Sequence, residues 1–368
     1  MKSYSENKSF LSQYLPLTEL CSDTQKVLIS PSLQGRVLTS TSGSGDVSYG
    51  WINHKLIASG KQLPHCNNWG GEDRFWLGPE GGQFSLFFKQ GTDFSFQDWQ
   101  TPACIDTLPW KEVAHTPTSA TYTHQASLLN TSGTPIECRL TRTVRLIEDA
   151  HFGKGVSCVH FVSENTVTNV GNNTWDEQTG MPSIWILGQF IPSEHATILI
   201  PYTPQAGAKI NDRYFGKIDE DRLQAAGNCL FFKADGKKRG KIGIPPEMAH
   251  PIAGSYDPIS RTLTIIRFTP PREGDRYVNS MWQYQEDPFY GDAVNAYNDG
   301  PLDDGSIMGP FYELESSSCA LHLSPGESHT HTHETMHFGG TPEQLNAISQ
   351  QYLGVYLPKS TKSDQKTL

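Results

Sequence analysis

The chain of 368 residues has 29 Lys and Arg against 39 Asp and Glu, a net charge of −10, and 11% of its residues are aromatic. This balance argues against a nucleic-acid binder, because neutralising phosphates requires clustered Lys and Arg, and the aromatic content argues against disorder. No stretch approaches the ~20 apolar residues of a membrane-spanning helix, so we expect a soluble protein without a membrane or nucleic-acid partner.

Seven cysteines are scattered along the chain without a Cys-x-x-Cys pair. An odd, scattered set is typical of buried thiols in a reducing compartment. The first residues show neither the apolar core nor the cleavage site of a signal peptide. We therefore expect a cytoplasmic protein.

Short runs rich in Val, Ile, Thr and Phe predict strands with turns between them. The clearest runs are 36–41, 84–88, 140–147, 156–162, 183–187, 197–200, 230–232 and 262–268. Residues 233–241 predict a solvated basic hairpin tip. Residues 284–300 carry no strand pattern and predict a long loop.

Helical signals are sparse. A short helix is expected around residues 10–14. Thr341, Pro342 and Gln344 form an N-cap, a first-turn proline and a capping box, which predicts a C-terminal helix over 341–354.

No change in composition marks a domain boundary. We therefore predict an N-terminal extension (1–24), one all-β domain (25–357) that includes the C-terminal helix, and a disordered tail (358–368). A large antiparallel β-sandwich fits this rhythm of strands and turns, and a two-domain division near 150–165 is the alternative.

The segment 65–83 combines two Gly-Gly pairs with aromatic, acidic and basic side chains. Aromatic faces can stack on sugar rings, and polar side chains can bind sugar hydroxyls. The candidate substrate-binding residues are Asn67, Trp69, Glu72, Asp73, Arg74, Trp76, Glu80 and Gln83. The alternative is a polar-aromatic corner of the core, with Glu72 and Arg74 paired structurally.

Three patterns give the chain a family resemblance. Gly70-Gly71 followed by Trp76 and Pro79, the stretch Thr166-Val-Thr-Asn169, and Gly309-Pro-Phe-Tyr-Glu-Leu-Glu315 resemble signatures of the galactose-mutarotase-like superfamily, which includes the aldose 1-epimerases. The match covers roughly residues 25–340. It is similar to a bacterial branch outside the characterised epimerase group.

The resemblance implies a large antiparallel β-supersandwich and a carbohydrate ligand. It also implies sugar-ring opening, in which a glutamate base takes a proton from the anomeric hydroxyl and a histidine acid protonates the ring oxygen. Glu313 and Glu315 stand two apart on a predicted strand, share one face and are the candidate bases. An exposed acidic strand face is the alternative.

The histidine that the resemblance implies is missing from residues 180–187, where Trp185 is a further candidate substrate-binding residue. His65, beside the Gly-Gly segment, is the candidate that replaces it.

A row of histidines lies near the C-terminus. His333 and His337 fit the zinc-protease pattern His-Glu-x-x-His, but alternating threonines and flanking glycines argue against the helix that this pattern requires. On a strand, His329, His331 and His333 share one face and could hold a divalent metal with a neighbouring carboxylate. A polar strand without a ligand is the alternative, and the row is expected beside the Glu313–Glu315 strand.

These observations favour a carbohydrate-active protein, an aldose mutarotase or epimerase with a glutamate base and no required cofactor. Two alternatives remain: a non-catalytic carbohydrate-binding protein on the same fold, and a metal-dependent lyase or isomerase that uses His329, His331 and His333.

Overall fold

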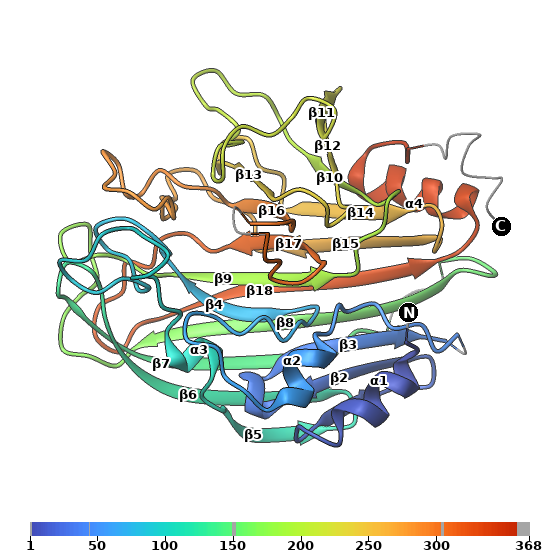
Figure 1. Ribbon diagram of the computed structural model, residues 1–368, viewed down its shortest axis with the longest axis horizontal. Coiled ribbons are helices and arrows are strands. Elements are labelled where there is room, and N and C mark those ends of the chain that lie inside the picture. The colour runs from blue at the N-terminus through green and yellow to red at the C-terminus, as the bar shows by residue number, and fades with distance from the viewer. Residues whose placement is uncertain (1, 44, 149–151, 303–304, 359–368) are drawn as a thin grey trace.

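The computed structural model describes residues 2–43, 45–148, 152–302 and 305–358, which fold mainly into antiparallel strands (Figure 1). Ten strands form the largest sheet, in the order β11-β12-β10-β14-β15-β18-β8-β7-β6-β5. Their bounds are β5 (Lys111–Thr116), β6 (Ser119–Leu129), β7 (Pro135–Leu146), β8 (Ser157–Asn169), β10 (Thr197–Pro201), β11 (Leu223–Ala226), β12 (Cys229–Lys233), β14 (Ile252–Asp257), β15 (Thr262–Phe268) and β18 (Ser328–Gly339).

Two smaller sheets complete the sandwich. The five-stranded sheet has the order β13-β16-β17-β9-β4, and the three-stranded sheet the order β1-β2-β3. Their bounds are β1 (Thr18–Cys21), β2 (Gln25–Ser30), β3 (Arg36–Ser42), β4 (Arg74–Gly78), β9 (Ser183–Phe190), β13 (Gly240–Ile244), β16 (Val294–Asn298) and β17 (Tyr312–Ser317). The predicted all-β fold with large antiparallel sheets is confirmed. Strand β1 lies within the segment expected as an N-terminal extension.

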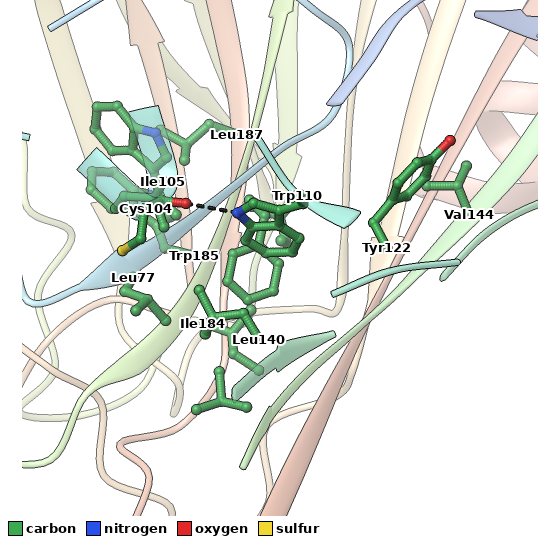
Figure 2. Packing of buried hydrophobic residues seen from close by; sticks show 14 of the residues in the cluster. Leu77, Cys104, Ile105, Trp110, Tyr122, Leu140, Val144, Ile184, Trp185 and Leu187 are labelled. Carbon is green, nitrogen blue, oxygen red and sulfur yellow. Dashed lines mark hydrogen bonds between the residues drawn. The ribbon is translucent and has the colours of Figure 1, made fainter. Parts of the chain in front are cut away.

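The core lies between the five-stranded and ten-stranded sheets. Leu77 of β4 and Ile184 of β9 are fully buried in one cluster with Leu140 of β7 (Figure 2). A second cluster joins Ile242 of β13 and Leu314 of β17 to the strands around β14. One face of the five-stranded sheet is therefore occupied by packing, and its other face is left for polar side chains.

Helices lie at the periphery (Figure 1). The C-terminal helix α4 (Pro342–Leu353) has the predicted Thr341–Gln344 capping box and packs against β10, β14 and β15. The first helix is α1 (Tyr4–Leu11), earlier than the expected 10–14, because Ser3 and Glu6 form a capping box that starts it. The others are α2 (His54–Ser59), α3 (Ala103–Asp106) and the 3-10 turn η1 (Pro31–Leu33). None of the helices in the described ranges has the length and apolarity to cross a membrane.

Seven of the eight predicted strands are confirmed, and the eighth, 84–88, is wrong. This segment forms turns, because the Ser85 hydroxyl donates to the Glu80 carbonyl and accepts from the Phe87 amide. Such local bonds compete with strand pairing. The loop predicted over 284–300 is wrong in part: residues 294–298 form β16, with Val294 and Ala296 facing the core.

Candidate functional site

Strand pairing gathers charged and aromatic side chains on the outer face of the five-stranded sheet. Glu313 of β17 lies opposite Gln189 of β9, and Glu315 lies opposite Leu187, which is itself opposite Arg74 of β4. Because side chains alternate along a strand, Tyr312, Leu314 and Ser316 point to the other face. The spacing of Glu313 and Glu315 indicated this sharing of a face.

Glu313 is held by one of its two carboxylate oxygens. Its Oε1 accepts hydrogen bonds from Arg74 Nη2 at 2.7 Å and Gln189 Nε2 at 3.0 Å, and Oε2 has no partner within the described residues. The side chain is 8% exposed. Burial raises the pKa of Glu313 to about 7, although the Arg74 charge works to lower it. A carboxylate with one free oxygen and a pKa near neutrality suits a general base.

The guanidinium of Arg74 has further hydrogen-bond donors that are not paired within the described residues. Its Nε and Nη1 are buried without a hydrogen-bond partner, while its guanidinium lies 4.3 Å from the centre of the Trp76 ring. Buried unpaired donors are costly, so such groups mark places where water or a ligand binds.

Glu315 is held in the same way as Glu313, by two donors on one oxygen, but it is more deeply buried. Its Oε2 accepts hydrogen bonds from Lys241 Nζ and Trp185 Nε1, both at 2.9 Å, and its side chain is fully buried. Burial works to lower the pKa of Lys241, but the Glu315 and Glu80 carboxylates outweigh burial and raise it. Glu315 and Lys241 therefore form a buried ion pair, and the Oε1 of Glu315 is buried without a partner among the described residues. Because the Glu313 side chain is 8% exposed and that of Glu315 is fully buried, Glu313 is the better candidate base.

A second acid lies beside this pair. Asp292 accepts a hydrogen bond from the Tyr214 hydroxyl, and burial raises the pKa of Asp292 to about 6. Asp292 comes so close to β13 that a Cβ added at Gly243 would lie 2.0 Å from its Oδ2. Only glycine fits at position 243 with Asp292 in this place.

A cleft of about 1210 Å³ opens beside this polar face. Lys241, Tyr214 and Glu80 line it, and Asn68 connects it to Glu313 by accepting a hydrogen bond from Gln189 at 3.4 Å. Its aromatic lining residues are His65, Phe96, Trp99, Phe215 and Trp282. Trp99 stacks on both Phe96 and Trp282, which builds a continuous aromatic surface of the kind that sugar rings contact.

The sequence-predicted site residues divide into two groups. Glu313, Glu315, Arg74, Trp76 and Trp185 meet on the polar face. His65 and Glu80 line the cleft, and His65 Nδ1 donates to the Trp99 carbonyl at 2.6 Å.

The remaining predicted substrate-binding residues have partners inside the protein. Asn67 donates a hydrogen bond to Asp106, and Asp73 forms an ion pair with Arg142. The Gln83 side chain donates a hydrogen bond to the main-chain carbonyl of residue 285. Glu72 is fully buried between Ser40 and His337, and Trp69 packs under the guanidinium of Arg36. None of these five lines the cleft among the described residues.

The histidine row lies on the opposite side of β17 from the carboxylates. His331 Nε2 and His333 Nδ1 both bond the Ser316 hydroxyl at 2.8 Å, and both rings are fully buried, whereas His329 is partly exposed. The histidine row thus lies beside the Glu313–Glu315 strand, but on its other face, because Ser316 and Glu315 point to opposite faces. Across the described ranges no group of three or more His, Cys, Asp or Glu side chains is arranged to hold a metal. Metal binding by His329, His331 and His333 stays a prediction.

Sequence reasoning missed the roles of Lys241 and Gln189. Lys241 belongs to the basic segment 233–241 expected as a solvated hairpin tip, but it is buried on β13 beside Glu315. The alternation of Arg239, Lys241 and Gly243 is the sequence pattern that could have indicated a strand at this position. Gln189 lies on the strand after Trp185 and was identifiable only once its pairing with Glu313 was known.

Comparison with solved structures identifies the class to which this architecture belongs. The fold is galactose-mutarotase-like. It matches a protein from Escherichia coli, provisionally assigned as an aldose 1-epimerase, with a TM-score of 0.54 and 15% identity over 89% of this chain and 99% of that chain. A galactose mutarotase-like protein from Lactobacillus casei matches with a TM-score of 0.50 and 12% identity over 88% of this chain and 100% of that chain. At these identities the likeness shows the fold.

The sequence itself places the chain more narrowly. It belongs to the family described as "Family of unknown function (DUF6786)", whose model matches residues 2–363. A search of curated protein sequences finds no significant match.

Proposed function

We propose that the cleft binds a sugar and that the protein interconverts its anomers with Glu313 as the base. The observation that supports this most directly is the geometry of Glu313: one oxygen is fixed by Arg74 and Gln189, the other is free, and the pKa is about 7. The fold is also that of the Escherichia coli protein provisionally assigned as an aldose 1-epimerase.

In the proposed reaction Oε2 of Glu313 takes the proton of the anomeric hydroxyl. The C1–O5 bond breaks, its electron pair goes to O5, and an acid donates a proton there to give the open-chain aldehyde. Rotation about C1–C2 and the reverse steps close the ring as the other anomer. No cofactor enters this balance, and general acid–base catalysis contributes ~10²–10⁴-fold per group.

His65 is our candidate for the acid. Its Nδ1 is engaged as a donor to the Trp99 carbonyl, which leaves Nε2 to exchange a proton in the cleft that His65 lines. The ring is also oriented by Phe96, whose centroid lies 4.7 Å from that of His65.

The test is the rate of anomer exchange, followed by polarimetry and NMR on a panel of freshly dissolved α-aldoses. We expect Glu313→Gln to lose about 10²–10⁴-fold of the catalysed rate and Glu315→Gln to lose less. Glu164→Gln, an exposed change on β8, is the control and should keep the full rate. A fully active Glu313→Gln variant would show that Glu313 is not the base.

A non-catalytic sugar-binding protein is the second candidate. It is favoured by β9, which carries Trp185 and Gln189 and no histidine where the resemblance implies the acid. Ligand-detected NMR separates the two: sugar binding without faster anomer exchange supports this candidate. If no sugar of the panel binds or exchanges faster, both are wrong.

A further inference from the structure

The charge of the cleft is opposite to that of the chain. Although the protein has a net charge of −10, five cations line the cleft, and Glu80 is the one acidic residue that lines it among the described residues. The cations are Lys55, Lys61, Lys238, Arg239 and Lys241. A cleft with walls of one sign concentrates ligands of the opposite sign.

Two of the five cations are already neutralised. Lys241 pairs with Glu315 at 2.9 Å, and Lys238 pairs with Asp219 on the surface. Lys55, Lys61 and Arg239 form no ion pair within the described residues. Lys55 and Lys61 are exposed, one on α2 and one just after it.

Of these three cations, Arg239 has the side chain that is best oriented to bind an anion. Its side chain is partly buried, and its Nε is buried without a hydrogen-bond partner. The guanidinium carbon lies 3.6 Å from the centre of the Phe215 ring, so the planar group is held in one orientation. A guanidinium fixed in this way presents several parallel N–H donors, the geometry that matches carboxylate and phosphate oxygens.

Position along the chain places Arg239, which lines the cleft, near the polar face that carries the candidate base. Arg239 immediately precedes β13 and stands two residues before Lys241, so both side chains lie on one side of the strand. Lys241 reaches Glu315 on β17, two residues from Glu313. Arg239 and Lys241 therefore lie next to each other along the wall of the cleft. The volume of about 1210 Å³ exceeds the roughly 300–1,000 Å³ of ordinary ligand pockets, which leaves room for a substituent beyond one ring.

We propose that the cleft selects a sugar with an anionic substituent, a carboxylate or a phosphate, and that Arg239 is the residue that binds this group. The proposal rests on the proposed function, that the cleft takes a sugar. Lys55 and Lys61, which also line the cleft, attract the anion, and the Glu313 face receives the anomeric end.

The probes are three sugars that differ at one carbon: glucose, glucuronate and glucose 6-phosphate. We expect binding, measured by calorimetry, to be tightest for one of the two anionic sugars, and which of them binds identifies the group as carboxylate or phosphate. Arg239→Gln should weaken that binding by about 10- to 100-fold and leave glucose unchanged. Arg239→Lys should recover only part of the loss, because the ammonium lacks the planar fork.

The control variant is Arg145→Gln on β7, which removes the same charge from an exposed ion pair with Glu164 of β8 and should not alter binding. Thermal unfolding of each variant checks that the fold is intact. Raising the salt from about 0.05 to about 0.5 M should weaken binding of the anionic sugar and leave glucose binding unchanged.

The outcomes distinguish the anionic-substituent proposal from the proposal that the cleft binds a sugar. Equal binding of all three sugars by the wild type, unaffected by Arg239→Gln, would overturn the anionic-substituent proposal and leave sugar binding standing. Binding of inorganic phosphate, followed by ³¹P line broadening, should be lost in Arg239→Gln. If phosphate binds in this Arg239-dependent way and no sugar does, the anion site is supported and sugar binding is wrong; if neither binds, both proposals are wrong.

Discussion

At the scale of single residues, Glu313 and Glu315 show how two identical side chains on one strand acquire different chemistry. Each has two donors on one oxygen, Lys241 and Trp185 on Glu315 and Arg74 and Gln189 on Glu313. The second oxygen of Glu315 is buried without a partner in the described ranges, whereas the Glu313 side chain is 8% exposed. Burial is the main cause that raises the pKa of Glu313, and two neighbouring charges adjust it in opposite directions: Arg74 lowers it and Glu315 raises it.

This arrangement predicts a pH dependence. A base works when deprotonated, so the catalysed rate should rise as the pH increases through about 7 and then level off. Arg74→Gln removes a charge that lowers the pKa of Glu313 and should move the rise to higher pH. Glu315→Gln removes a charge that raises it and should move the rise to lower pH.

Initial rates of anomer exchange between about pH 5 and pH 9 measure all three profiles. Shifts of the two variants in the same direction would contradict this account of how the Glu313 pKa is set.

At the scale of the elements, β17 separates two polar systems. Its outer face carries Glu313 and Glu315, and its inner face presents Ser316, whose hydroxyl is the shared partner of His331 and His333 on β18. The other ring nitrogens, His331 Nδ1 and His333 Nε2, are buried without a partner in the described part of the chain. Ser316 is thus the connection between the two sheets at this point.

Ser316→Ala should therefore destabilise the protein by about 1–3 kcal/mol, because two buried imidazoles lose a hydrogen-bond partner. Ser317→Ala is the matched control. It makes the same change one residue away on the opposite face, where the hydroxyl bonds no described residue, and should cost less than about 0.5 kcal/mol. Denaturant unfolding measures both, and equal losses would contradict the assigned role of Ser316.

How much of the structure can be predicted from the sequence depends on the kind of element. Strands with alternating apolar residues, the capped helix α4 and the shared face of Glu313 and Glu315 all follow from local patterns. The site beyond those residues does not, because Lys241 and Gln189 reach it through pairing between strands far apart in the chain. The aromatic run 84–88 also misled, since its apolar residues anchor turns in the core.

At the scale of the whole molecule, ionisable groups buried between the sheets tie stability to pH. His331 and His333 are completely buried, and burial lowers the pKa of both. His333 is also near Asp73, which works against this lowering, and Arg142, which adds to it. His329 and His333 are the charges that further lower the pKa of His331.

The unfolded chain therefore binds more protons than the folded one as the pH falls below about 6.5, so acid should destabilise the fold from that point downward. His331→Gln removes one such group and should reduce the slope of the unfolding free energy by up to about 1.4 kcal/mol per pH unit. Denaturant titrations between about pH 8 and pH 5 measure the slope. His115→Gln, an exposed change on β5, is the control, and an unaltered slope in His331→Gln would refute the linkage.

The cleft has one further consequence, which concerns how such a protein can diverge. Arg74, Gln189 and the candidate base Glu313 lie on β4, β9 and β17, where every strand is paired on at least one side. Many of the cleft-lining side chains, the candidate acid His65 among them, lie on irregular segments around residues 61–68, 80, 96–99 and 280–282. Insertions and substitutions in irregular segments cost little stability. Descendants of one ancestral chain could thus exchange substrates by changing the other residues of these segments while keeping His65 and the same reaction.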